Sequence, residues 1–159
     1  MNQLKYCIVC CVIALALLSC DDSYQSSIPD YYVNLSLDLN TSYSSIRNNP
    51  NHYLLFEKPN FATDGVGYGG ILVYCGWDSY YYAFDLSCPY ERKPSTRVHP
   101  NDLGQAICDS CKTVFDISLG IGNPISRKRL NASDTTALAK EPLRRYKASL
   151  SGNILYISK

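Results

Sequence analysis

Two cysteine-bearing loops constrain this chain more than any other feature of its sequence. The first loop reads Cys-Pro-Tyr-Glu from Cys88, and the second reads Cys-Asp-Ser-Cys-Lys-Thr-Val-Phe-Asp from Cys108 to Asp116. Each loop is entered from a strand-like run. Two such loops facing one another are how a β protein builds a metal or disulfide centre. We therefore expect the two loops to converge on one site.

The spacing of these loops resembles that of the Rieske iron-sulfur family, whose loops read Cys-x-His and Cys-x-x-His. In that family the cysteines hold one iron and the histidines hold the other. Cys88 and Cys108 stand at the cysteine positions of the family, whereas Tyr90 and Cys111 stand at its histidine positions. The seventeen residues of 91–107 match the usual separation. The resemblance thus keeps the spacing and replaces both histidine ligands.

The flanks extend the resemblance to roughly residues 65 to 157. Phe115-Asp116 and the turn with Gly120, Gly122 and Pro124 are similar to the aromatic-Asp pair and the Gly/Pro loop of the family. The resemblance implies an all-β fold of antiparallel sheets, in which the two cysteine loops form a small cluster-binding subdomain. It also implies electron transfer to a redox partner.

The resemblance implies a modified [2Fe-2S] centre. Its ligands would be Cys88, Cys108 and Cys111, with Tyr90, Cys75 or one of the two histidines as the fourth. Each thiolate that replaces an imidazole adds negative charge at the iron, so the reduction potential should fall toward about −400 mV, as in all-cysteine ferredoxins. A phenolate is a poor substitute ligand, because the intrinsic pKa of tyrosine is about 10.

Other chemistries remain open for the same residues. The loops can be a degenerate, cluster-free version held by disulfides among Cys75, Cys88, Cys108 and Cys111. These four cysteines allow three pairings. They can also hold structural zinc, which prefers four nitrogen or sulfur ligands. A dithiol redox pair at Cys108 and Cys111 is disfavoured, because the strand-like Thr113-Val114-Phe115 follows where such pairs require a helix. His52 and His99 lie in Asn/Pro-rich loops, so we expect them to be solvated.

The start of the chain predicts export. Lys5 precedes an apolar stretch from Tyr6 to Leu18, and the small residue Ser19 follows, as in a secretory signal peptide over residues 1–19. The apolar stretch is too short to span a membrane comfortably. Leu17-Leu18-Ser19-Cys20 resembles a bacterial lipobox, which implies lipidation of Cys20. We therefore expect a lipid-anchored protein of the bacterial cell envelope, at the outer membrane or cell surface.

Residues 20–30 contain the predicted lipidated cysteine and a polar stretch without periodicity, which we interpret as a flexible tether. Residues 31–159 are then short enough for a single domain. Without the predicted signal peptide, which contains Lys5, fourteen basic and fourteen acidic residues remain. This balance excludes the charge excess typical of nucleic-acid-binding proteins.

Alternation of apolar and polar residues predicts strands rather than helices. Val33 to Leu39 alternates with period two, and a short apolar run covers residues 53–56. Residues 71–75 and 80–86 predict a hairpin that leads into Cys88, and residues 143–150 and 154–157 predict a closing hairpin. Residues 105–107 and 113–117 should be the strands beside the second loop. We interpret the basic stretch 127–138 as an inserted surface loop.

These observations favour an envelope lipoprotein with a Rieske-like domain, which either carries a modified iron-sulfur centre or has lost its cluster. The alternative is a zinc- or disulfide-stapled lipoprotein that binds a partner or supports the envelope. We do not expect it to act as an enzyme on its own, because catalysis in the Rieske family normally resides in partner domains. Its partners would be the membrane, through the lipid anchor, and a redox or other envelope protein.

Overall fold

The computed structural model describes residues 26–127 and 137–159. The predicted signal peptide, the predicted lipidation site Cys20, residues 20–25 of the predicted tether and most of the basic insertion lie outside the described residues. Within those two ranges, no helix is long and apolar enough to cross a membrane.

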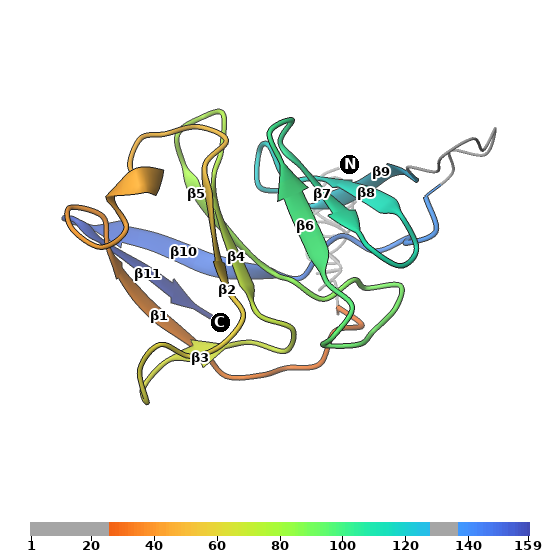
Figure 1. Cartoon of the computed structure of the whole chain (residues 1–159), viewed down its shortest axis with the longest axis horizontal. Coiled ribbons are helices and arrows are strands. Elements are labelled where there is room, and N and C mark those ends of the chain that lie inside the picture. Colours follow the sequence, from red (N-terminus) through yellow and green to blue (C-terminus); the bar gives the residue numbers. More distant parts are fainter. Residues whose placement is uncertain (1–25, 128–136) are drawn as a thin grey trace, which may run out of the picture.

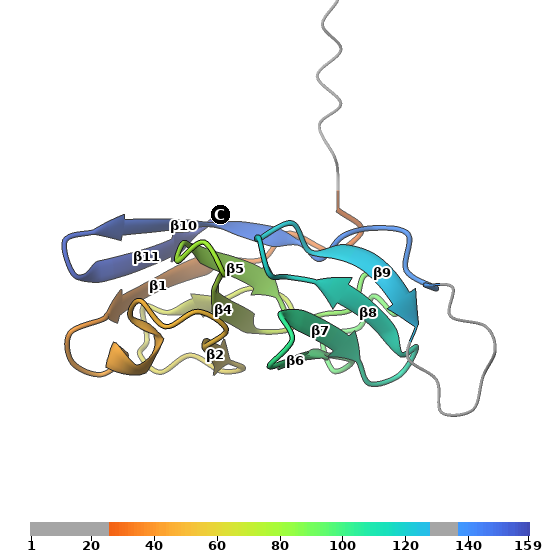
Figure 2. The ribbon, with the colours of Figure 1, turned by 90° about the horizontal axis from the view of Figure 1, so that it is seen from above.

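The described residues form an all-β fold with two antiparallel sheets, which lie side by side in Figure 1 and Figure 2. The larger sheet is a near-closed barrel of seven strands in the order β2-β4-β5-β10-β11-β1-β3. Its strands are β1 (Val33–Asp38), β2 (Tyr53–Phe56), β3 (Gly65–Val66), β4 (Ile71–Cys75), β5 (Tyr81–Asp85), β10 (Arg145–Ser151) and β11 (Ile154–Ser158). A short 3-10 helix, η1 (Ser44–Ile46), follows β1.

The smaller sheet has four strands in the order β6-β7-β8-β9. They are β6 (Val98–Asn101), β7 (Gln105–Cys108), β8 (Thr113–Asp116) and β9 (Asn123–Arg127). Every pairing in the sheet is antiparallel. The register between β8 and β9 shifts between Val114 and Phe115, where β9 has one extra residue, Ile125. The smaller sheet carries the second cysteine loop, between β7 and β8.

The expected strands are confirmed. Val33, Leu35 and Leu37 of β1 point into the larger sheet and are buried, as their alternation predicts. The predicted hairpins are β4 with β5 and β10 with β11, each with a continuous antiparallel register. The strands predicted beside the second loop are β7 and β8.

Two strands, β4 and β5, are buried on both faces and separate two hydrophobic cores. The barrel core lies inside the larger sheet and consists of Val33, Leu35, Leu37, Leu39, Ile46, Phe56, Ile71, Val73, Cys75, Ala83, Tyr146, Leu155 and Ile157. The inter-sheet core lies between the two sheets and consists of Leu72, Tyr74, Tyr82, Phe84, Leu86, Cys88, Val98, Ala106, Cys108, Cys111, Phe115, Ile117, Ala139 and Leu143. Successive side chains of a strand point to opposite faces, so β4 and β5 supply both cores.

Two parts of the chain lie closer to the fold than their sequence indicated. Residues 26–30, which we assigned to the tether, contact the domain, and Ile28 among them is only 1% exposed. Leu138, the last residue of the stretch we interpreted as an inserted loop, packs against the inter-sheet core, and the next residue, Ala139, belongs to that core. Such contacts cannot be predicted from a polar stretch of sequence, because the one or two apolar residues that make them show no periodicity.

Candidate metal centre

The local backbone fixes Cys88 and Cys108 on opposing elements. Cys88 follows β5; its N–H bonds the carbonyl of Thr96 at 3.1 Å, and its carbonyl accepts the N–H of Arg92 at 2.9 Å. Cys108 ends β7 and pairs with Val98 of β6. A bridge between Ser87 and Arg97 holds the first loop beside the smaller sheet. Both sulfurs therefore enter the inter-sheet core from backbone that is already ordered.

Cys111 comes to the same place from the turn between β7 and β8. The N–H of Lys112 bonds the carbonyl of Cys108 at 3.1 Å, which closes the turn. Lys112 has a φ of 59°, a left-handed conformation that side chains with a Cβ adopt rarely. This conformation reverses the chain directly after Cys111 and lets β8 return alongside β7.

The three sulfurs converge. The Sγ atoms of Cys88, Cys108 and Cys111 all lie within 4.8 Å of one another, and those of Cys88 and Cys111 are 3.7 Å apart. Cys88 and Cys108 are fully buried, and Cys111 is 7% exposed. All three are free thiols in this structure. We call these three residues the cysteine trio; together they can hold a metal ion.

Thr113 supports the trio from β8. Its Oγ1 lies 3.2 Å from Cys111 Sγ and accepts hydrogen bonds from the backbone N–H groups of Leu138 and Ala139, each at 3.3 Å. Thr113 thus links Cys111 to the chain that follows the basic insertion. The sequence interpretation missed this role, although a hydroxyl two residues after Cys111 was a usable signal.

The sulfurs hold their protons unequally. Hydrogen bonds from Cys108 and Cys88 lower the pKa of Cys111 strongly, and Thr113 adds to this effect. Hydrogen bonding to Cys108 and Cys111, together with burial, raises the pKa of Cys88. Hydrogen bonding to Cys111 also raises the pKa of Cys108. Hydrogen bonds within the trio therefore favour ionisation of Cys111 over that of Cys88 and Cys108, and a bound metal ion would displace the protons of the sulfurs that it binds.

The other residues considered as ligands lie elsewhere. Cys75 is buried in the barrel core, on the opposite face of β4 from the inter-sheet core. Tyr90 is 51% exposed. His99 lies in β6 with an exposed side chain, and its Nε2 is 2.8 Å from a carboxylate oxygen of Asp109. His52 is exposed just before β2. The structure therefore brings together only three of the cysteines considered.

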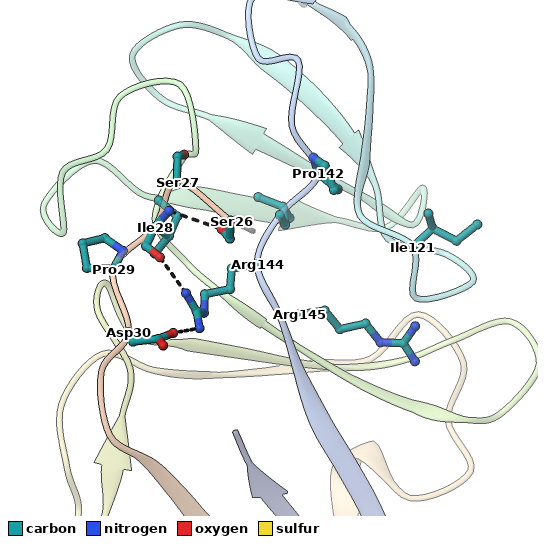
Figure 3. A pocket seen from close by; sticks show the side chains of 10 residues that line it. Ser26, Ser27, Ile28, Pro29, Asp30, Ile121, Pro142, Arg144 and Arg145 are labelled. Carbon is teal, nitrogen blue, oxygen red and sulfur yellow. Dashed lines mark hydrogen bonds and ion pairs between the residues drawn. The ribbon is translucent and has the colours of Figure 1, made fainter. Parts of the chain in front are cut away.

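Residues 26–30, which we call the N-terminal strap, lie against the first cysteine loop. The hydroxyl of Ser27 donates to the carbonyl of Pro89 at 3.2 Å, directly after Cys88. Arg144 donates to the carbonyl of Ile28 at 2.6 Å and to the carboxylate of Asp30 (Figure 3). These contacts fix the strap on the domain beside the trio.

Two hollows flank this region. A cleft of about 630 Å³ lies between the strap and residues 142–145, and Ile121 also lines it. In Figure 3 the guanidinium of Arg144 turns toward the strap, whereas that of Arg145 extends away from it. A smaller hollow of about 270 Å³ is lined by Pro89, Tyr90, Arg92, Leu138, Lys140 and Glu141. No sulfur of the trio lines either hollow, so neither is the metal centre itself.

Comparisons of the chain with protein-family models, with curated proteins and with solved structures found no match.

Proposed function

We propose that this protein is a lipid-anchored domain of the bacterial cell envelope that uses a Rieske-like scaffold to bind one thiophilic metal ion through Cys88, Cys108 and Cys111. The convergence of three buried sulfurs carries the proposal. Two thiolates that share one tetrahedral zinc ion, each at about 2.3 Å, stand about 3.8 Å apart. The Sγ atoms of Cys88 and Cys111 are 3.7 Å apart, which fits ligands of one ion.

This geometry favours one ion over a two-iron cluster. In the Rieske arrangement Cys88 would bind one iron, and Cys111, at a histidine position, would bind the other. The two ligand pairs of such a cluster stand at its opposite ends, so ligands of different irons should be farther apart than ligands of one ion. The short separation of Cys88 and Cys111 does not fit that expectation. Tyr90, the remaining cluster position, is half exposed.

We assign the ion as zinc, for which the trio supplies three of the four preferred ligands. Thiolates are soft ligands, which select zinc, copper(I) or iron-sulfur clusters. Zinc bound by three thiolates has room for a fourth ligand, such as a water molecule. Structural zinc sites usually have four protein ligands, whereas this site has three. Because the trio is almost entirely buried, we still assign the ion a structural role: it joins the first cysteine loop to the smaller sheet.

The test is a metal analysis of the full chain in detergent, produced without oxygen. We expect about one zinc ion per chain and no broad visible absorbance. Cys88→Ala should lower the zinc affinity at least 100-fold. Cys75→Ala is the matched control, because Cys75 is equally buried but lies outside the trio, and it should keep the zinc. Tyr90→Phe should change the affinity less than twofold.

Two results would contradict the proposal. Two iron and two sulfide ions per chain, with broad visible absorbance, would support the electron-transfer alternative. Protein that is metal-free with Cys88 or Cys108 in a disulfide, and that still binds no zinc after reduction, would support a disulfide-stapled domain.

A further inference from the structure

The three sulfurs of the cysteine trio lie within 4.8 Å of one another, so a disulfide between two of them can compete with a bound ion. Cys88 and Cys111 have sulfurs 3.7 Å apart, and a disulfide requires about 2.0 Å, so the sulfurs must approach by about 1.7 Å. We propose that Cys88 and Cys111 form a reversible disulfide that releases the bound ion. This inference rests on the function proposed above and names the regulation of that site.

The backbone indicates which sulfur moves. Cys88 is held by hydrogen bonds through both its N–H and its carbonyl, and Cys108 is held in β7 by pairing with Val98. Cys111 lies in a turn whose other residues, Asp109, Ser110 and Lys112, are exposed. A turn at the surface adjusts more easily than a paired strand. Cys111 is therefore the sulfur that can approach Cys88.

Solvent exposure also indicates that Cys111 is the cysteine that reacts with an oxidant first. Cys88 and Cys108 are 0% exposed, whereas Cys111 is 7% exposed. An oxidant from solution therefore meets Cys111 first, because thiol-disulfide exchange requires contact between the two sulfurs. The Sγ of Cys88, at 3.7 Å from that of Cys111, is close enough to complete the reaction without a large movement.

The oxidant is a small disulfide, R–S–S–R. The thiolate of Cys111 attacks one of its sulfurs, which forms a mixed disulfide and releases one RS⁻. The thiolate of Cys88 then attacks the sulfur of Cys111, which forms the Cys88–Cys111 disulfide and releases the second RS⁻. Each RS⁻ takes a proton from water. The two cysteine sulfurs have lost two electrons, and R–S–S–R has been reduced to two RSH.

The ion loses its site in this reaction. Only Cys108 remains as a thiolate ligand, and one thiolate does not hold a divalent ion in a buried apolar core. The oxidised state keeps a bond between the first cysteine loop and the turn after β7, so the fold retains a cross-link in place of the metal. Exported proteins fold where disulfides form and persist, so both states are accessible in the predicted compartment.

The experiment uses the full chain in detergent, loaded with zinc under reducing conditions. Oxidised glutathione is added, released zinc is followed with a chromogenic chelator, and disulfides are assigned by peptide mapping. We expect at least a tenfold loss of bound zinc together with a Cys88–Cys111 disulfide, and recovery of zinc binding after reduction. Cys75→Ala should behave as the wild type. Cys108→Ala should form the same disulfide, because Cys108 takes no part in it.

The outcomes separate the two proposals. Zinc that stays bound, with all three cysteines alkylated as thiols once the protein is unfolded, would overturn this inference and leave the metal site standing. A disulfide that includes Cys108 in the wild type would do the same. Reduced protein that binds no zinc would contradict the proposed function. Mapping of that same sample would still decide whether Cys88 and Cys111 form the pair.

Discussion

The barrel core and the inter-sheet core share the strands β4 and β5, but the polar groups in the two cores differ in their hydrogen-bond partners. In the larger sheet, the carboxylate of buried Asp85 accepts hydrogen bonds from the hydroxyl of Tyr146 and the N–H groups of Tyr68, Gly69 and Ser87, at 2.7 to 3.1 Å. In the inter-sheet core, the sulfurs of the trio bond mainly to one another. The Asp85 carboxylate, with its acceptors occupied, stabilises the fold, although the hydroxyl of Ser87 nearby is buried without a hydrogen-bond partner. The cluster of thiols could hold a metal ion.

Strand alternation decides which cysteine joins which centre. Cys75 shares a face of β4 with Ile71 and Val73 and points into the barrel core. Cys88 continues the face of Phe84 and Leu86 and points into the inter-sheet core. Both cysteines are fully buried. Burial alone therefore does not make a metal site; the convergence of several ligands does.

Removal of Asp85 should have the largest effect on this comparison. We expect Asp85→Ala to lower the free energy of unfolding by about 3 kcal/mol or more, because it leaves several buried donors without an acceptor. Urea unfolding measures the change. Asp102→Ala, at an exposed carboxylate, is the control and should have little effect. A loss of less than about 1 kcal/mol in Asp85→Ala would show that the barrel centre does not depend on this carboxylate.

Alkaline pH should weaken both cores. Burial raises the pKa of Tyr74 and of Tyr82, each in the inter-sheet core, to about 12. Burial and the nearby Asp85 also raise the pKa of Tyr146 in the barrel core. A raised pKa in the folded state means that stability is complete below the unfolded pKa of about 10 and falls as the pH rises toward 12.

We expect these tyrosines together to cost about 2 kcal/mol or more by pH 12. Urea unfolding across this range, with tyrosinate absorbance as the titration signal, measures the effect. Tyr74→Phe is the matched variant and should reduce the pH dependence, because it removes one of these ionising groups. Tyrosines that all ionise near pH 10 in the folded protein would contradict the comparison.

Removal of the Thr113 hydroxyl should give the smallest effect and should be confined to the trio. We expect Thr113→Val to lower zinc affinity about tenfold, because it removes the hydrogen bond to Cys111 and the acceptor for the N–H groups of Leu138 and Ala139. Competition with a chromogenic chelator measures the affinity. Thr113→Ser keeps the hydroxyl and should bind zinc nearly as well as the wild type. Equal zinc affinities for Thr113→Val and Thr113→Ser would show that the Thr113 hydroxyl does not support the site.

Much of the fold could be predicted because its inner strands are apolar and regular. The sequence interpretation missed β6 and β9, the two outer strands of the smaller sheet. Each contains a proline, Pro100 or Pro124, and β6 also contains the exposed His99. Proline cannot donate to a strand pair, so it is tolerated at sheet edges and hides such strands from pattern analysis.

The cysteines of the candidate site could be predicted from the sequence, but the residues around them could not. Spacing alone indicated that Cys88, Cys108 and Cys111 belong together, and they do lie together. Spacing could not show that Tyr90 is exposed, because that depends on the path of the loop after Pro89. Nor could it show the contact of Ser27 with that loop, which joins residues 62 positions apart.

The double burial of β4 and β5 also governs how the molecule should come apart. Each of these strands packs one face against the barrel core and the other against the inter-sheet core. Loss of packing in one core therefore weakens strands that the other core needs. Melting should therefore be cooperative, with the barrel and the smaller sheet lost in a single transition. Loss of packing at the cysteine loops would then also destabilise the hairpin of β10 and β11, because β4 and β5 belong to both cores.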